Sequence, residues 1–165
     1  MQIRIAGFVQ ESIVDGPGIR FVVFTQGCPH HCPGCHNPQT HDFQGGRIED
    51  TENIIPMISK NPLLKGITIS GGEPFCQPEA AAELAKAAHD CGKDVLVYTG
   101  YTLEELLSGS IRGARSLLEE TDILIDGRFE LEKKSLLLKF RGSSNQRLLD
   151  CKKSLKFSYP VEIEL

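Results

Sequence analysis

Four short, continuously apolar runs recur along the chain, with enough sequence between them for a helix. They are rich in β-branched and aromatic residues and show no polar alternation, which is typical of strands buried on both faces of a parallel sheet. Each run is followed by a glycine or a polar residue, so loops of chemical interest are predicted at the carboxyl ends of the strands. The runs are 21–25, 66–70, 94–98 and 123–125.

The intervening segments have helical periodicity. It is clearest in 78–91, where apolar residues recur at spacings of three and four and Gly92 ends the pattern. Weaker patterns, interrupted by proline or glycine, cover 50–60 and 103–120. The alternation of strand and helix predicts an α/β fold.

The length limits how the strands are arranged. A complete eight-fold barrel needs about 250 residues, and this chain has 165. We therefore expect one domain over 1–165, folded as an open partial (β/α) barrel. In the less regular tail, 136–138 and 155–157 are expected to be strands.

Composition narrows the class of protein. A net charge of -4 argues against general nucleic-acid binding. No run approaches the length of a membrane span, and the N-terminus lacks the pattern of a signal peptide. We expect a cytoplasmic protein without membrane contact, in which the six cysteines are ligands, redox groups or core residues rather than disulfides.

A compact cysteine triplet follows the first predicted strand. Cys28, Cys32 and Cys35 lie within eight residues, which allows three thiolates to bind one side of a compact metal centre. Electron-carrying ferredoxins give each iron of a [4Fe–4S] cluster its own cysteine. Three local cysteines leave one iron free to bind a substrate directly.

Two alternatives remain open for this loop. A structural zinc site would use neighbouring histidines among His30, His31 and His36 to complete four ligands. A thiol–disulfide site would use the C-x-x-C pair of Cys32 and Cys35. The other cysteines lack such a setting: Cys76 and Cys91 are expected to pack structurally, and Cys151, beside two lysines, to have a lowered pKa.

A second motif, Gly71-Gly72-Glu73-Pro74, follows the second predicted strand. Two glycines let the backbone approach a ligand closely, and Glu73 adds an acceptor for a cationic group. A simple turn would explain this motif alone equally well.

Together the two motifs are similar to those of the radical S-adenosylmethionine superfamily, which pairs Cys-x3-Cys-x2-Cys with a Gly-Gly-Glu-Pro strand end. Within it, the chain resembles the activating proteins of glycyl radical enzymes, and its short length points to the branch that serves an anaerobic ribonucleotide reductase. Further support comes from segments 15–20 (Asp-Gly-Pro-Gly-Ile-Arg), 35–38 (Cys-His-Asn-Pro) and 141–147 (Arg-Gly-Ser-Ser-Asn-Gln-Arg).

The resemblance implies an oxidoreductase that reductively cleaves S-adenosylmethionine at a [4Fe–4S] cluster. The resulting 5′-deoxyadenosyl radical generates a glycyl radical on the large subunit of the reductase. An activase of another glycyl radical enzyme, such as pyruvate formate-lyase, is the alternative. A one-electron donor such as reduced flavodoxin is also implied.

The resemblance also assigns the site. The cluster loop is 26–38, with Cys28, Cys32 and Cys35 as ligands, and the S-adenosylmethionine-binding strand end is 70–74. Gly71, Gly72 and Glu73 are expected to hold the methionine amino group. Gly34, Cys35 and His36 are expected to lie along the nucleoside. Many members of the superfamily have an aromatic residue where this chain has Gly34, so contact with the adenine must come from elsewhere.

Three expectations concern the end of the fourth predicted strand and the tail. Arg128 is expected to pair with the methionine carboxylate, the alternative being a solvated surface arginine. Asp126 is expected to bind a monovalent cation or orient the site, or simply to cap a turn. In the C-terminal segment 137–165, which is expected to face the partner, Arg141, Asn145, Gln146 and Arg147 form a dense set of donors for docking or closure, or a capped helix start.

Overall fold

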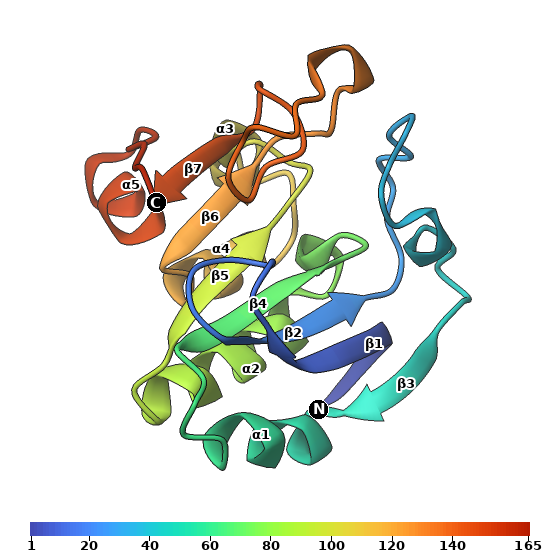
Figure 1. Cartoon of the computed structure of the whole chain (residues 1–165), viewed down its shortest axis with the longest axis vertical. Helices are drawn as coiled ribbons and strands as arrows, with labels where there is room; N and C mark the ends of the chain where they lie inside the picture. The colour runs from blue at the N-terminus through green and yellow to red at the C-terminus, as the bar shows by residue number, and fades with distance from the viewer.

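A single seven-stranded sheet runs through the centre of the computed structural model, which describes all 165 residues (Figure 1). The strand order is β3-β1-β2-β4-β5-β6-β7. The strands are β1 (Gln2–Ser12), β2 (Arg20–Thr25), β3 (Arg47–Asp50), β4 (Gly66–Gly71), β5 (Asp94–Tyr98), β6 (Ile123–Asp126) and β7 (Arg147–Asp150).

The four central strands are parallel, and the outer ones are antiparallel. β2, β4, β5 and β6 pair in parallel, whereas β1, β3 and β7 join the sheet antiparallel to their neighbours. The carboxyl ends of the four parallel strands therefore lie at one edge, where loops from all of them can meet.

Helices cover one face of the sheet. They are α1 (Thr51–Ser59), α2 (Pro78–Asp90), α3 (Leu103–Leu107), α4 (Ala114–Glu119) and α5 (Cys151–Phe157). Alternate strand residues such as Ile67, Ile69, Val95 and Val97 point into a core of 25 buried residues between the sheet and these helices. This burial of apolar surface is the main stabilising contribution to the fold.

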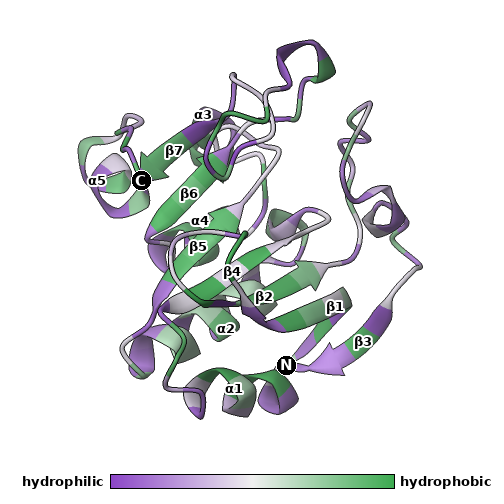
Figure 2. Cartoon of the chain, viewed as in Figure 1, coloured by the Kyte–Doolittle hydropathy of each residue, from purple (hydrophilic) through white to green (hydrophobic).

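The other face of the parallel strands is also covered. Leu96 and Ile125 form a second buried cluster, against which Phe140 and the C-terminal residues Ile163 and Leu165 pack. Figure 2 shows the resulting apolar colouring along the central strands. Burial on both faces explains why the runs are continuously apolar rather than alternating.

All four predicted strands and the helix at 78–91 are confirmed, as is the α/β class. The weak pattern at 50–60 forms α1, and that at 103–120 divides into α3 and α4. The sheet is open, with β3 and β7 as its edges, and the barrel remains a prediction.

Two expectations for the tail are wrong. Residues 136–138 form an exposed turn instead of a strand, and 155–157 lie inside α5. The antiparallel strands β1, β3 and β7 were not predicted. None of the helices has the length and apolar character needed to cross a bilayer.

Candidate functional site

The loop after β2 carries the three cysteines and folds back on itself. Gly27 N donates to Thr40 O at 2.7 Å and Cys28 N to His41 O at 3.2 Å, which closes the loop at its base. At its tip, Cys35 N donates to Cys32 O at 3.1 Å. The two bonds at the base bring residues far apart in the loop together, and the bond at the tip closes a turn.

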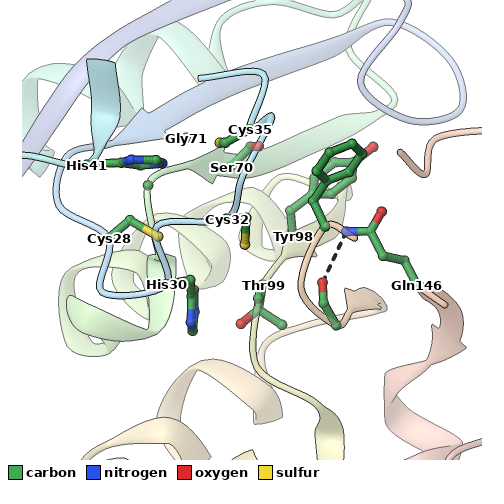
Figure 3. Close-up of a pocket in the computed structure, with 14 residues that line it drawn as sticks. Cys28, His30, Cys32, Cys35, His41, Ser70, Gly71, Tyr98, Thr99 and Gln146 are labelled. Carbon is green, nitrogen blue, oxygen red and sulfur yellow. Dashed lines mark hydrogen bonds between the residues drawn. The ribbon is translucent and has the colours of Figure 1, made fainter. Parts of the chain in front are cut away.

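The three thiols line a single cavity of about 120 Å³ (Figure 3). All three are free cysteines. Cys28 is buried, whereas Cys32 and Cys35 are half-buried. Burial, reinforced by the negative charge of Glu73, raises the pKa of the Cys28 thiol. Cys28 is therefore part of the buried wall of the cavity, and Cys32 and Cys35 are more exposed to solvent.

The opposite wall comes from the ends of the parallel strands. Backbone and neutral side chains predominate there, so that the cavity has room for a ligand beside the thiols. The lining residues of this wall are Ser70, Gly71 and Gly72 after β4, Tyr98, Thr99 and Gly100 after β5, Gly127 and Phe129 after β6, and Gln146 before β7. The predicted convergence of the cysteine loop and the glycine motif is therefore observed.

The donor set fits a [4Fe–4S] cluster bound through three thiolates. Thiolates are the preferred ligands of iron–sulfur clusters, and the three here share the cavity with no other cysteine. The Asn37 N–H donates to Cys35 Sγ at 3.4 Å, the kind of bond that stabilises a cluster sulfur. No three His, Cys, Asp or Glu side chains are grouped closely enough to hold a single metal ion.

Gly71 and Gly72 seat the cysteine loop against β4. A Cβ on Gly72 would lie 2.4 Å from Gly27 O, and one on Gly71 would lie 2.5 Å from Thr25 N. Gly72 N donates to Thr25 O at 2.7 Å. Both glycines line the cavity, but the close approach that requires them is to the protein's own backbone.

Glu73 is the centre of a buried network rather than a wall residue. Its carboxylate is completely buried and accepts bonds from Phe75 N at 3.0 Å, Gly100 N at 2.9 Å and Thr99 Oγ1 at 2.9 Å. The remaining position is taken by His30 Nε2 at 2.7 Å. A carboxylate has about four acceptor positions, and protein donors fill them, so Glu73 clamps the cysteine loop to β5.

Asp126 likewise has protein partners for both oxygens. It is buried, accepts from Leu103 N at 2.8 Å and pairs with Arg147 at 2.5 Å. This pairing raises the pKa of Arg147. Asp126 caps α3 and ties it to β7, which agrees with the turn-capping alternative and leaves no free oxygen for a cation.

Arg128 lies outside the cysteine cavity. Its guanidinium pairs with Glu105 at 2.9 Å and lies 5.9 Å from the centre of the Tyr101 ring. The hydrogen bond that Arg128 donates to Glu105 raises the pKa of Arg128, and Glu105 also completes the capping box of α3 with Thr102. The side chain is half-exposed in this position.

An aromatic residue occupies the space next to Gly34. Gly34 has a φ of +76°, and a Cβ there would lie 2.9 Å from Leu131 and 3.3 Å from Phe129. The Phe129 ring lines the cavity and lies 5.3 Å from the ring of His36. The apolar surface missing from the cysteine loop is therefore supplied by the segment after β6.

The side chains of segment 141–147 mainly form hydrogen bonds within the protein, close to the cavity. Gln146 accepts from Gly142 N at 2.8 Å and donates to Gly127 O at 3.0 Å, the bond dashed in Figure 3. Asn145 donates to Arg128 O at 2.7 Å. These side chains bind the backbone around β6, and only Gln146 reaches the cavity.

The expectations for the remaining cysteines are wrong. Cys76 and Cys91 are exposed rather than packed in the core. Cys151 is fully buried, and burial raises its pKa to about 12 instead of lowering it.

Sequence reasoning missed His41 and Thr99 as lining residues, and it named His30 and Gln146 only for other roles. His30 and Thr99 were detectable in principle, because each adjoins a motif or strand end. His41 and Gln146 reach the cavity through loop geometry that no local pattern specifies.

Comparison with known proteins identifies the family. The sequence profile described as "4Fe-4S single cluster domain" matches residues 14–149. The anaerobic ribonucleoside-triphosphate reductase-activating protein of Pasteurella multocida is 37% identical over 142 residues, covering 81% of this chain and 89% of that protein. The chain belongs to the anaerobic ribonucleoside-triphosphate reductase-activating protein family.

Other members of this activating-protein family are similarly related. The Escherichia coli protein is 36% identical over 81% of this chain and 90% of its own length, and that of Enterobacteria phage T4 is 32% identical over 82% and 86%. Among solved structures, QueE from Escherichia coli matches with a TM-score of 0.49 and 18% identity, covering 62% of this chain and 54% of that chain. Membership of the activating-protein family confirms the resemblance on which the sequence interpretation rests, and with it the expectation of an iron–sulfur protein.

Proposed function

We propose that this chain activates an anaerobic ribonucleoside-triphosphate reductase by generating a glycyl radical on its large subunit. The observation that carries the proposal is the shared cavity, in which three free thiols face the carboxyl ends of three parallel strands. Family membership supports this target over pyruvate formate-lyase or another glycyl radical enzyme.

Cys28, Cys32 and Cys35 would hold the [4Fe–4S] cluster, and S-adenosylmethionine would occupy the rest of the cavity. The cluster, when bound, supplies the electron that cleaves S-adenosylmethionine, and the protein provides orientation and a dry site. The proposed fold type, an open partial (β/α) barrel, is supported by the four parallel strands with helices on one face.

Different residues of this chain would bind different parts of S-adenosylmethionine. The carbonyls of Gly71 and Gly72 are candidates for the methionine amino group, because both residues line the cavity. Phe129 and the adjacent His36 would provide the flat apolar surface for the adenine. Glu73 would act indirectly, by holding His30 and the cysteine loop in place.

Three finer points concern the electron donor, the partner-facing segment and a cation. Reduced flavodoxin is a suitable one-electron donor. The segment 137–165 remains the proposed partner-facing part of the single domain. We propose no monovalent cation at Asp126, because its carboxylate pairs with Arg147 and accepts a hydrogen bond from Leu103 N.

Anaerobic reconstitution tests the proposal. We expect about four irons per chain, an EPR signal of the reduced cluster that changes on adding S-adenosylmethionine, and a glycyl radical EPR doublet on the reductase subunit. Stoichiometric zinc in protein purified without oxygen would contradict it.

Cysteine variants locate the cluster. Replacing Cys28, Cys32 or Cys35 with alanine should abolish 5′-deoxyadenosine formation, since each removes one of three protein ligands. Cys91→Ala is the matched control, because this exposed thiol bonds only to helix carbonyls at Ala87 and Ala88. Full activity of Cys32→Ala would refute the ligand assignment.

A further inference from the structure

An apolar tip projects beside the mouth of the cysteine cavity. Residues 130–144 form a hairpin closed by the bridge between Lys134 and Ser143 and by the bond from Ser135 N to Gly142 O at 3.2 Å. In Figure 1 this hairpin is the orange loop at the top, next to the blue cysteine loop. We refer to it as the 130–144 hairpin.

The base of the 130–144 hairpin is fixed to the site. Leu131 packs on Gly34 of the cysteine loop, and Phe140 O accepts from the Tyr98 hydroxyl at 2.7 Å. Glu130 N donates to Ser143 Oγ at 3.2 Å. These contacts hold the hairpin relative to the cavity, because Gly34's loop and Tyr98 belong to its walls.

The tip is apolar and has no covering within the chain. Leu136 is 90% exposed and Leu137 is 96% exposed, the two most exposed large apolar side chains of the molecule. Two adjacent leucines that are almost fully exposed to solvent favour aggregation unless a partner covers them.

The 130–144 hairpin carries four basic and two acidic side chains, so the charge around its tip is positive on balance. Lys134 and Lys139 flank the leucines, are exposed and make no ion pair, whereas Lys133 pairs with Glu130 at 3.2 Å. The whole chain has a net charge of -4, so this local basic character is distinctive. It complements a partner surface that carries carboxylates.

We propose that Leu136 and Leu137 dock into an apolar pocket, bordered by carboxylates, on the reductase subunit that carries the target glycine. This inference rests on the proposed function. The target glycine must reach the cavity itself, so the subunit that bears it must cover the mouth and whatever projects there. An electron donor has no such need, because an electron does not require atomic contact with the cavity.

The test compares binding with partner-independent chemistry. The reconstituted Leu136→Ser/Leu137→Ser protein should bind the reductase subunit about tenfold or more weakly, since each buried leucine contributes well over the 1.4 kcal/mol that a tenfold change represents. Its glycyl radical yield at limiting reductase should fall in parallel. Cleavage of S-adenosylmethionine with a chemical reductant and no reductase should stay within about twofold of the wild type.

A matched pair of exposed apolar residues serves as the control. Ile48 on β3 and Leu63 before β4 are 52% and 63% exposed, and neither lines the cavity. Ile48→Ser/Leu63→Ser should bind the reductase as the wild type does.

A charge variant gives an independent measurement. Lys134→Glu/Lys139→Glu keeps the leucines, and should weaken binding about three- to tenfold at low salt, with a smaller difference at high salt.

The outcomes separate the inference from the function. Unchanged reductase affinity in both hairpin variants, with a normal radical yield, would overturn the docking role alone. Loss of reduction by a protein donor with intact reductase binding would also overturn it, since the tip would then serve the donor. If the wild type forms no glycyl radical on the reductase, the proposed function fails, and the docking inference with it.

Discussion

The ends of β4 and β6 look alike in sequence but serve different parts of the molecule. Each strand ends in glycine and a charged residue, and each was expected to bind the cofactor. At the end of β4, Gly72 and Glu73 seat and clamp the cysteine loop. At the end of β6, Asp126 holds α3 and β7, and Arg128 pairs with Glu105 at the surface.

The comparison shows how charge is used around this site. The charged side chains at both strand ends are satisfied by protein partners, and the cavity is lined by thiols, two histidines, backbone and uncharged side chains. A buried charge is tolerated only when it is paired and hydrogen-bonded, so these residues stabilise the walls instead of facing a ligand. The two ends should therefore respond differently to substitution.

The largest effect is expected at Gly72. Gly72→Ala places a Cβ 2.4 Å from Gly27 O, so the cysteine loop must move. We expect loss of most of the bound iron and destabilisation of about 1–3 kcal/mol from overpacking. Gly7→Ala on β1 is the control, because a Cβ there meets nothing within 4 Å. Wild-type iron content and melting temperature in Gly72→Ala would show that the loop does not depend on this contact.

The two buried carboxylates provide the sharpest contrast. Glu73→Gln turns an NH2 toward backbone donors and should cost about 1–3 kcal/mol, together with loss of part of the bound iron. Asp126→Asn should cost about 1–3 kcal/mol, because Arg147 keeps Glu104 as a partner at 2.6 Å. Urea unfolding and iron analysis distinguish them. Loss of iron from Asp126→Asn, measured where it is folded, would remove the difference between the strand ends.

A smaller effect is expected at the opposite end of β6. His89 bonds to Asp122 at 2.7 Å and to Glu120 at 3.0 Å. Burial alone would lower its pKa, but these two carboxylates outweigh burial and raise it. The stabilisation is therefore complete below the unfolded pKa of about 6.5 and is lost as pH rises through the higher folded pKa.

His89→Gln should accordingly reduce the free energy of unfolding by about 1 kcal/mol at pH 6 and by less at pH 9. Urea titrations at the two pH values measure this difference. An equal loss of unfolding free energy at both pH values would mean that the stabilising effect of His89 does not depend on its charge. The iron content of the variant should match that of the wild type.

The smallest effect is expected for Arg128→Ala. An exposed ion pair contributes about 0–1 kcal/mol, and Arg128 does not line the cysteine cavity. The Kd for S-adenosylmethionine, measured by equilibrium binding to the reconstituted protein, should stay within about twofold of the wild type. A tenfold rise would restore Arg128 as a partner of the methionine carboxylate.

Local pattern predicted the parallel centre of the sheet well and its edges poorly. The runs that became β2, β4, β5 and β6 are apolar throughout because both faces are buried, and this signal needs no knowledge of neighbours. The antiparallel β3 and β7 are only four residues long, and β1 shows alternation only around Ile3 and Ile5. Their pairing depends on partners distant in sequence.

By itself the sequence determined the α/β alternation, the cysteine triplet and the glycine motif, because each depends only on the spacing of residues that are close together in the sequence. Only the tertiary structure decided which charged side chains face the cavity and which form hydrogen bonds and ion pairs with other protein groups. That decision depends on long-range partners, such as His30 for Glu73 and Arg147 for Asp126, since a carboxylate binds whichever donors the fold brings within reach.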